Sequence, residues 1–314
     1  MVVMGRAQLA DPDFCKKAEA GQTDDIDYCI GCNQGCYDGF ENMDMECITC
    51  LRNPALGREK ECEIHLTEKS ETVLVAGGGI AGLEAAIILK KRGHDPILCE
   101  ATDTLGGQFL TAGEAPRKKE MKAAAISMAK KAERLGVDIR MNTKVTPEMI
   151  EEIKPHTVMN AIGAESIIPP IPGVDKAFVK DSHDVLDGKA EATGNVVVIG
   201  GGMVGMETAE YLAEKGAKVS VLEMLPDICS DMGTTRKICM GEEIQKSGII
   251  PVTSVKVTEI GDNVVIGEKD GEKVEFPCDT AVLAIGAKKR DGSALAETCY
   301  KNGIGYFEIG DAAM

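Results

Sequence analysis

The chain has 314 residues, of which 44% are hydrophobic and 27% are charged, so it is globular and long enough for two or three domains. Its net charge of −16 excludes nucleic acid and anionic membrane as partners, because both bind basic surfaces. Twelve cysteines are too few for a disulfide scaffold and no signal peptide is visible, so we expect a cytoplasmic protein.

The N-terminal part of the chain is short of regular structure and rich in cysteine. Val2-Val3-Met4 predicts a buried strand, and Asp11-Pro12-Asp13 predicts the start of a short helix that ends near Ala20. Residues 21–66 have weak periodicity and contain five cysteines between Cys29 and Cys50. Such clustering indicates a metal site rather than disulfides, and a bound metal would order the segment.

The spacing of these cysteines is compatible with two kinds of metal site. Cys29 and Cys32 with Cys47 and Cys50 are close to the spacing of a zinc ribbon, which leaves Cys36 without a role. Cys29, Cys32 and Cys36 with one later cysteine supply the four thiolates of a [4Fe–4S] cluster. Two nucleotide sites later in the chain favour the cluster, since an electron carrier is useful beside them. Free thiols are the third possibility.

An internal repeat follows the cysteine segment. Val73-Leu-Val-Ala-Gly-Gly-Gly-Ile-Ala-Gly82 matches Val196-Val-Val-Ile-Gly-Gly-Gly-Met-Val-Gly205 at an offset of 123 residues, and the match covers a whole strand–helix–strand unit. Both copies carry the glycine fingerprint of a dinucleotide-binding fold. An acidic residue ends the second strand of each unit, Glu100 in the first and Glu223 in the second.

Each glycine of the fingerprint has its own physical task. The first permits a tight turn, the second lets the backbone approach a pyrophosphate, and the third lets the helix pack on the strand. The acid accepts hydrogen bonds from a ribose. Glu223 therefore opposes a 2′-phosphate, and because Met224 and Leu225 follow it rather than arginine, the second unit favours NADH over NADPH. The glycines are Gly77, Gly79 and Gly82 in the first unit and Gly200, Gly202 and Gly205 in the second.

The remaining elements complete an α/β fold of two Rossmann-like domains. Between the repeats the pattern predicts a helix over 118–135, short strands over 138–145 and 157–163, and a proline-rich linker around 169–172. After the second repeat, residues 280–286 echo residues 157–163. None of the four histidines lies in a ligand or triad pattern.

Several motifs resemble the NADH:flavin oxidoreductases that carry an old-yellow-enzyme barrel. That family includes 2,4-dienoyl-CoA reductase, trimethylamine dehydrogenase, enoate reductases and bile-acid-inducible oxidoreductases. The resemblance covers essentially the whole chain. It rests on Gly5-Arg6, Ala10-Asp-Pro-Asp13, Cys29-Ile-Gly-Cys-Asn-Gln-Gly-Cys36, Cys50-Leu-Arg-Asn-Pro-Ala-Leu-Gly57, Leu105-Gly-Gly-Gln108, Asn160-Ala-Ile-Gly163 and Ile309-Gly-Asp-Ala312.

The resemblance implies cofactors and their residues. It selects Cys50 over Cys47 as the fourth cluster ligand, after Cys29, Cys32 and Cys36. It implies FMN phosphate at Gly5 and Arg6, and NADH at Gly200, Gly202, Gly205 and Glu223. It implies FAD at Gly77, Gly79, Gly82, Glu100, Gly107, Gln108, Gly163 and Asp311.

The resemblance also implies a domain order. Residues 1–20 would end a TIM barrel, and residues 21–66 would form the iron–sulfur segment. The FAD domain would occupy 67–170 and 289–314, with a linker at 171–193 and the NADH domain at 194–288. The barrel precedes this motif in the family, so we expect a fragment that lacks most of the barrel and has no catalytic residue of the barrel site. The strand Val2–Met4 should then be frayed or badly packed, because its pairing partners are missing.

The implied activity is electron transfer from NADH through FAD and [4Fe–4S] to FMN. The substrate would be a small molecule with an activated C=C bond, reduced or formed in the reverse reaction, and the missing barrel portion and a second copy of the chain are expected partners. A pyridine-nucleotide-disulfide reductase is one alternative, although it requires a redox cysteine pair. A non-catalytic nucleotide-binding fragment is the other.

Overall fold

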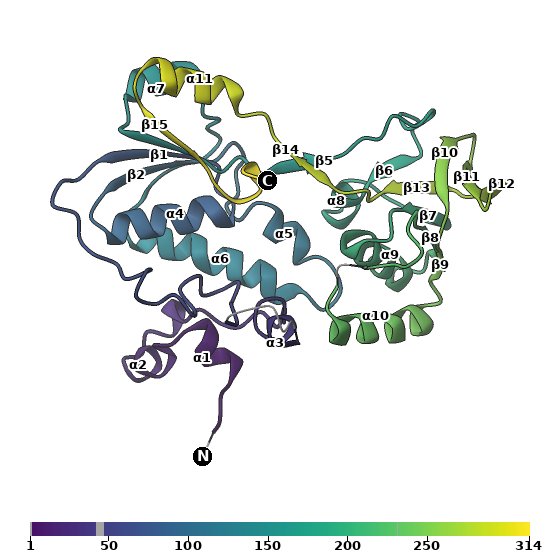
Figure 1. Cartoon of the computed structure of the whole chain (residues 1–314), viewed down its shortest axis with the longest axis horizontal. Helices are drawn as coiled ribbons and strands as arrows, with labels where there is room; N and C mark the ends of the chain where they lie inside the picture. The colour runs from purple at the N-terminus through teal and green to yellow at the C-terminus, as the bar shows by residue number, and fades with distance from the viewer. Residues whose placement is uncertain (1, 42–46, 231) are drawn as a thin grey trace. The chain divides into compact units, whose positions relative to one another are not determined.

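The computed structural model describes residues 2–41, 47–230 and 232–314 (Figure 1). These residues form two compact units. Unit 1 contains residues 1–113, 120–164 and 289–314, and unit 2 contains residues 114–119 and 165–288. No helix among the described residues is both long enough and apolar enough to cross a membrane.

Unit 1 is built on a five-stranded parallel sheet with the order β15-β4-β1-β2-β3. Both faces of β1 are buried, as expected for a parallel strand covered by helices on both sides. Val73 and Val75 join the core with α4 and α6, while Leu74 and Ala76 face α7 and α11. The strands are β1 (Thr72–Ala76), β2 (Asp95–Cys99), β3 (Asp138–Arg140), β4 (Thr157–Asn160) and β15 (Gly305–Glu308), and the helices are α4 (Ile80–Lys91), α5 (Gln108–Ala112), α6 (Lys119–Arg134), α7 (Pro147–Ile153), α11 (Ser293–Lys301) and η2 (Gly310–Ala312).

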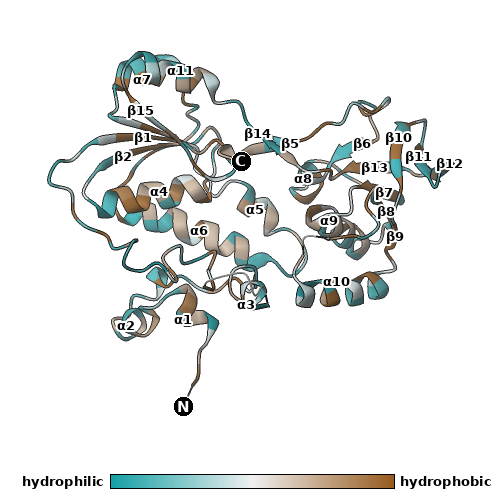
Figure 2. Ribbon diagram, viewed as in Figure 1, coloured by the Kyte–Doolittle hydropathy of each residue, from teal (hydrophilic) through white to brown (hydrophobic). Residues whose placement is uncertain are grey.

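The helices of unit 1 follow the hydrophobic pattern of the sequence. Helix α4 is one of the more hydrophobic helices in Figure 2, and it buries Leu83, Ala86 and Ile87 against the sheet. Helix α6 is amphipathic and buries Ala124, Ala125, Met128 and Ala132 on one side. The helix expected over 118–135 is thus present, and Lys131 and Arg134 lie in its last turn.

Unit 2 repeats this arrangement with the sheet order β6-β13-β7-β8-β9. Helix α9 packs on one face through Met206, Ala209 and Leu212. A three-stranded antiparallel sheet, β10-β11-β12, contributes Val265 to the core on the other face. The strands are β6 (Val179–Asp181), β7 (Asn195–Ile199), β8 (Lys218–Leu222), β9 (Ile250–Val252), β10 (Lys256–Ile260), β11 (Val264–Lys269), β12 (Glu272–Pro277) and β13 (Thr280–Leu283), and the helices are α8 (Ser182–Leu186), α9 (Met203–Glu214) and α10 (Thr234–Ser247).

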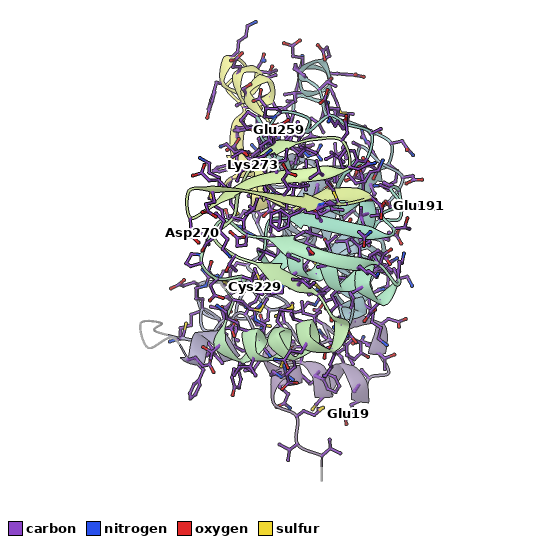
Figure 3. All side chains as sticks on the ribbon, turned by 90° about the vertical axis from the view of Figure 1, so that its right-hand side faces the viewer. Glu19, Glu191, Cys229, Glu259, Asp270 and Lys273 are labelled. Carbon is purple, nitrogen blue, oxygen red and sulfur yellow. The ribbon has the colours of Figure 1, made fainter. Side chains whose placement is uncertain are left out.

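The outer sheet of unit 2 has a tight hairpin and a charged surface. Asp270 and Gly271 connect β11 to β12 with φ values of 54° and 82°, the left-handed backbone that a two-residue hairpin turn requires. Figure 3 shows Asp270 at this turn, with Glu259 on β10 and Lys273 on β12. Two short strands, β5 (Ala164–Ser166) and β14 (Ala287–Lys289), pair where the chain passes between the units.

The first 66 residues contain short helices and no strand among those that the structure describes. The helices are α1 (Arg6–Ala10), α2 (Phe14–Glu19), η1 (Thr23–Asp25) and α3 (Tyr37–Glu41). Asp11 is 3% exposed and organises this part of the chain. Its carboxylate accepts hydrogen bonds from Lys17 Nζ at 2.6 Å and from the backbone N–H groups of Asp13 and Asp27 at 3.0 and 2.9 Å.

Val2–Met4 forms no strand, and Val2 and Val3 are 85% and 87% exposed, as expected of a strand that lacks its pairing partners. One expectation about local structure was wrong. The linker expected at 171–193 contains β6 and α8, since Val179–Asp181 pairs with β13 and Val185 is buried in the core of unit 2. The helix Arg6–Ala10 had no counterpart in the sequence analysis.

Asp181 and His183 form a pH-dependent cap at the start of α8. The Asp181 carboxylate accepts from the backbone N–H of His183 at 2.8 Å, and its Oδ1 lies 3.4 Å from His183 Nδ1. Burial alone would raise the pKa of Asp181, but hydrogen bonds from His183 and Ser166 lower that pKa to about 2. The hydrogen bond to Asp181 raises the pKa of His183.

We expect Asp181→Asn to destabilise unit 2 in a pH-dependent way. Asparagine retains the helix cap but loses the ion pair, whose contribution is complete below the ordinary His pKa of 6.5 and disappears as the pH rises through the raised pKa of His183. The loss is up to about 1 kcal/mol, or about 2–4 °C in Tm, at pH 5.5, and near zero at pH 9. Thermal unfolding at both pH values measures this loss of stability, with Asp175→Asn, at an exposed position of unit 2, as the control. An equal loss at both pH values would contradict the ion-pair account.

Candidate functional site

The turn from β1 into α4 contains two glycines that no other residue can replace without movement of the backbone. A β-carbon on Gly77 would lie 2.3 Å from the carbonyl oxygen of Ala161, and φ at Gly77 is 110°. A β-carbon on Gly82 would lie 1.9 Å from the carbonyl oxygen of Gly77. The first helical turn is therefore packed directly on the strand end. Gly79 is different, because the nearest atom to its β-carbon position is Gly107 Cα at 4.0 Å.

The N-terminus of α4 offers backbone donors to a ligand. Gly79 occupies the N-cap position and has no side chain to accept from the first-turn amides. The first intrahelical hydrogen bond from this end is that of Leu83 N–H to Gly79 O at 2.9 Å. Open space in front of Gly79, unpaired amides and the helix dipole together make a site for a phosphate group.

Glu100 fixes the shape of this loop. Its Oε2 accepts from the backbone N–H of Gly78 at 2.8 Å, and its Oε1 accepts from the N–H and hydroxyl of Thr102, both at 2.8 Å. A carboxylate has about four lone-pair positions, so acceptor capacity remains for a ribose hydroxyl. The acid predicted to bind ribose thus lies beside the predicted pyrophosphate loop.

The other predicted FAD residues lie around the same turn. Gly106 N–H donates to Gly78 O at 2.8 Å, and a β-carbon on Gly107 would lie 3.0 Å from Gly79 Cα. A β-carbon on Gly310 would lie 2.7 Å from Ala81 Cβ, which places Asp311, the next residue in η2, near the first turn of α4.

Gln108 and Gly163 come from later parts of the chain. Gln108 begins α5, and its Nε2 donates to Ala164 O at 3.3 Å. Gly163 has φ of 74° and accepts at its carbonyl from Arg290 N–H at 3.0 Å. The predicted FAD residues are therefore all in unit 1.

Unit 2 has an almost identical turn. A β-carbon on Gly200 would lie 2.3 Å from Ala284 O, one on Gly205 would lie 1.9 Å from Gly200 O, and one on Gly202 would meet nothing within 4 Å. Glu223 accepts from Gly201 N–H at 2.6 Å and from Leu225 N–H at 2.8 Å. The second dinucleotide site predicted from the sequence therefore has the same open position before its helix.

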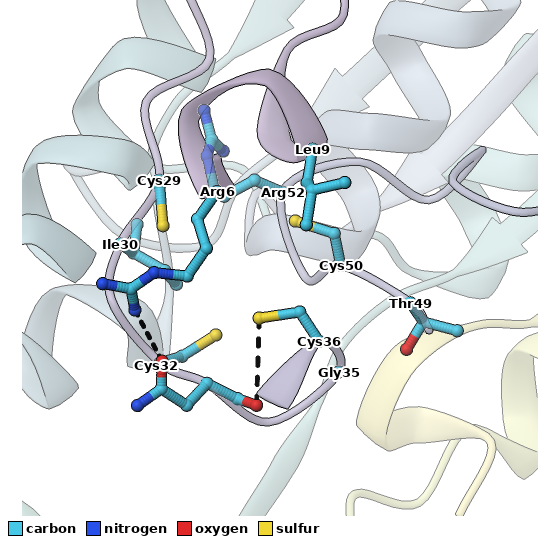
Figure 4. Close-up of a pocket in the computed structure, with 11 residues that line it drawn as sticks. Arg6, Leu9, Cys29, Ile30, Cys32, Gly35, Cys36, Thr49, Cys50 and Arg52 are labelled. Atoms are coloured by element: carbon cyan, nitrogen blue, oxygen red, sulfur yellow. Dashed lines mark hydrogen bonds between the residues drawn. The ribbon is translucent and has the colours of Figure 1, made fainter. Parts of the chain in front are cut away.

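Four cysteines line one pocket in unit 1 (Figure 4). They are the four predicted metal ligands, Cys29, Cys32, Cys36 and Cys50. Burial raises the pKa of the Cys32 thiol, and the nearby Cys36, Cys50 and Cys29 raise it further. Gly31 and Asn33 have φ values of 67° and 60°, which turns the chain between the first three cysteines.

A close backbone contact brings Cys50 to the other three cysteines. Thr49 N–H donates to Gly35 O at 2.8 Å, and a β-carbon on Gly35 would lie 2.5 Å from Thr49 Oγ1. The glycine between Gln34 and Cys36 is therefore needed for this approach. Cys47 is exposed and lies against Gly57 instead, outside the residues that line the pocket.

In the parts of the chain that the structure describes, no three His, Cys, Asp or Glu side chains are arranged to hold a metal ion, and metal binding at the four cysteines stays a prediction. In a [4Fe–4S] cluster each thiolate binds a different iron, so the four sulfur atoms surround a larger centre. Four thiols around one pocket fit that requirement.

Arg6 lies at the cysteine pocket. Its Nη1 donates to Asn33 Oδ1 at 2.6 Å, and Arg6 is among the residues that line the pocket (Figure 4). Gly5 is the N-cap of the five-residue helix α1. These are the two residues predicted to hold an FMN phosphate, and that role stays a prediction.

Ion pairs attach the cysteine segment to α6. Asp27 accepts from Arg52 Nη2 at 2.7 Å and from Lys131 Nζ at 2.8 Å. On the same helix, Ala125 Cβ lies 2.9 Å from the β-carbon position of Gly106. Ala125 and Lys131 are about 9 Å apart along the axis of α6. Helix α6 therefore supports both the predicted FAD turn and the cysteine segment.

Sequence reasoning did not find these supporting residues. Asp27 and Lys131 are 104 positions apart, and charged residues on a helix are usually solvated, so no local pattern marks them as partners. Thr102 was also missed, although a hydroxyl two residues after the acid is a signal that could have found it.

Comparison with known proteins identifies related sequences and structures. Residues 71–309 match the family model described as pyridine nucleotide-disulphide oxidoreductase. The bilirubin reductase of Mediterraneibacter gnavus is 41% identical over 92% of this chain and 45% of its own length. The NADH oxidase of Thermoanaerobacter brockii is 40% identical over 99% of this chain and 48% of its own length.

A solved structure agrees over nearly the whole chain. A 2-naphthoyl-CoA reductase complex superposes with a TM-score of 0.93 at 32% identity, over 99% of this chain and 47% of that one. The chain thus spans about half the length of the relatives that it matches.

Substitution of two glycines should separate the binding of a dinucleotide from the stability of the fold. Gly82→Ala places a methyl group against the carbonyl of Gly77, so we expect a loss of about 2–3 kcal/mol in the free energy of unfolding. Gly79→Ala has room and ordinary backbone angles, so stability should change by less than about 0.5 kcal/mol. Its methyl group should nevertheless block the pyrophosphate and lower the bound flavin per protein. Unchanged flavin content in Gly79→Ala would argue against this loop as the site.

Proposed function

Because this chain belongs to the pyridine nucleotide-disulphide oxidoreductase family, we propose that it is the NADH-dependent reductase portion of a larger enzyme. The enzyme would be one of the iron–sulfur flavoenzymes with an old-yellow-enzyme barrel, which this chain resembles. The observation that carries the proposal is the gathering of four cysteines around one pocket in the unit that also contains the first glycine turn. Electrons would pass from NADH through FAD and a [4Fe–4S] cluster to FMN.

Cys29, Cys32, Cys36 and Cys50 would hold the cluster. The contact between Gly35 and Thr49 brings the fourth thiol to the first three, and Cys47 lies elsewhere. This arrangement favours the cluster over the zinc-ribbon alternative, which would use Cys47 and leave Cys36 out. Asp27 and Lys131 hold the segment on α6, whose other contacts include the Gly106 turn. A shared support of this kind keeps two redox groups at a constant separation.

The two glycine turns would bind the two dinucleotides. In unit 1 the open position at Gly79 and the carboxylate of Glu100 are suited to the pyrophosphate and ribose of FAD, with Gly107, Gln108, Gly163 and Asp311 around them. In unit 2, Gly202 and Glu223 are the corresponding groups for NADH. Neutral backbone donors and the helix dipole bind the phosphates in both.

The complete enzyme would act on a small molecule with an activated C=C bond. The relatives include a bilirubin reductase and a 2-naphthoyl-CoA reductase, which supports reduction of such a bond as the overall reaction. FMN, bound through Gly5, Arg6 and a barrel, would be the group that meets this substrate. In this proposal the present residues deliver electrons and none of them touches the C=C bond.

Metal analysis of cysteine variants tests the cluster. Anaerobically purified protein should contain about four irons per chain and absorb broadly near 400 nm. Cys50→Ala should abolish both signals, because one thiolate is lost from the pocket, whereas Cys47→Ala should retain them. One equivalent of zinc without iron, or the opposite result for the two variants, would refute the assignment.

Nicotinamide preference tests the second turn. A 2′-phosphate beside the Glu223 carboxylate should lose at least about 1 kcal/mol, or several-fold in affinity, through like-charge repulsion. NADH should therefore reduce the flavin-loaded protein better than NADPH under anaerobic single-turnover conditions. Glu223→Gln should reduce the preference for NADH over NADPH several-fold. Glu191→Gln, at an exposed position, is the control and should leave this preference unchanged (Figure 3). Equal use of both nucleotides by the unmodified protein would contradict the proposal.

A further inference from the structure

Two arginines are the charged residues among those that line the cysteine pocket. They are Arg6 and Arg52, and no acidic residue is among the described residues that form its wall. The Arg52 side chain is only 5% exposed. Its Nε is buried and has no hydrogen-bond partner among the described residues. In a chain with a net charge of −16, this concentration of positive charge needs a physical reason.

The counter-charge around Arg52 is incomplete. Arg52 pairs with Asp27 at 2.7 Å, and Asp27 also pairs with Lys131 at 2.8 Å. The charges of Glu84 and Lys91 act on the same group, so two carboxylates face three cations. Arg6 adds a further positive charge at the pocket. A buried cation without full compensation is destabilising unless an anion lies beside it. A four-iron cluster held by four thiolates carries net negative charge and would supply that anion.

We propose that Arg52, which is among the residues that line the pocket and whose guanidinium is held by Asp27, raises the reduction potential of the cluster. Reduction adds one electron and makes or breaks no bond, so the centre gains one negative charge. A buried positive charge in the same part of the fold stabilises this more negative state. The inference rests on the proposed function, because it requires the cluster at these cysteines.

One substitution that removes a positive charge and one that removes a negative charge together distinguish electrostatic control from a purely structural role. Arg52→Gln removes a positive charge, so the ratio of reduced to oxidised cluster at a fixed potential should fall at least tenfold. For a one-electron couple this corresponds to a reduction potential lowered by about 59 mV. Arg52→Lys retains the charge and should restore most of the potential. Asp27→Asn removes a negative charge while keeping an oxygen acceptor for Arg52, so the potential should rise. Arg58→Gln, a nearby exposed control, should leave it unchanged.

The measurement is an anaerobic reductive titration followed by the electron paramagnetic resonance of the cluster, with iron content determined for each variant. Shifts of Arg52→Gln and Asp27→Asn in the same direction, or no shift in either, would overturn the proposal. If Arg52→Gln does not retain iron, an unchanged or lowered reduction potential in Asp27→Asn would by itself overturn the proposal. Absence of iron from the unmodified protein would instead refute the proposed cluster itself. Normal iron with unshifted potentials would refute only the role of Arg52.

Discussion

The contact of one backbone with another at Gly82 and at Gly205 is the constraint on which both nucleotide sites depend. The carbonyl oxygen of the first glycine of each loop occupies the place where a β-carbon of the third would be, at 1.9 Å. This contact starts each helix directly above the end of its strand. The helix N-terminus, the open second glycine and the acid on the neighbouring strand then share one small region. Glu100 and Glu223 hold the loop by accepting a hydrogen bond from the residue after the first glycine.

The cysteine segment depends on a different physical principle. It has little apolar core of its own, and Tyr28, Tyr37, Phe40 and Leu51 are exposed. Its order comes from buried or half-buried polar groups instead, chiefly Asp11, which precedes the segment and accepts from the Asp27 N–H, and Asp27, which pairs with α6. Polar networks of this kind fix a unique geometry but add little net stability. A metal cluster bound by four side chains would add the missing stabilisation, since metal binding is coupled to folding.

The sequence allowed prediction of those features that are encoded locally. The glycine pattern specifies the turns, the 123-residue offset specifies the duplicated unit, and the cysteine spacing marks Cys29, Cys32 and Cys36, because each involves residues within a few positions or a repeated motif. The choice of Cys50 over Cys47 came from the family resemblance and not from spacing. Val2–Met4 has the pattern of a strand but forms none, because strand pairing is a non-local property. The short strand within the expected linker at 171–193 was missed for the same reason, since its partner β13 lies about 100 residues later in the chain. The pairing of Asp27 with Lys131 had no local signal at all.

Under the proposed function the chain would bind anions in two ways, and the difference follows from what each anion must do. The dinucleotide turns use neutral backbone donors beside a carboxylate, so a nucleotide can enter and, in unit 2, leave without the release of a strong ion pair. The cysteine pocket uses guanidinium groups, one of which is buried. A permanent centre tolerates such a fixed charge, and a centre that changes its own charge is sensitive to it. Under the proposed function, fixed positive charge would therefore lie at a site where it acts on an electron rather than on the exchange of a ligand.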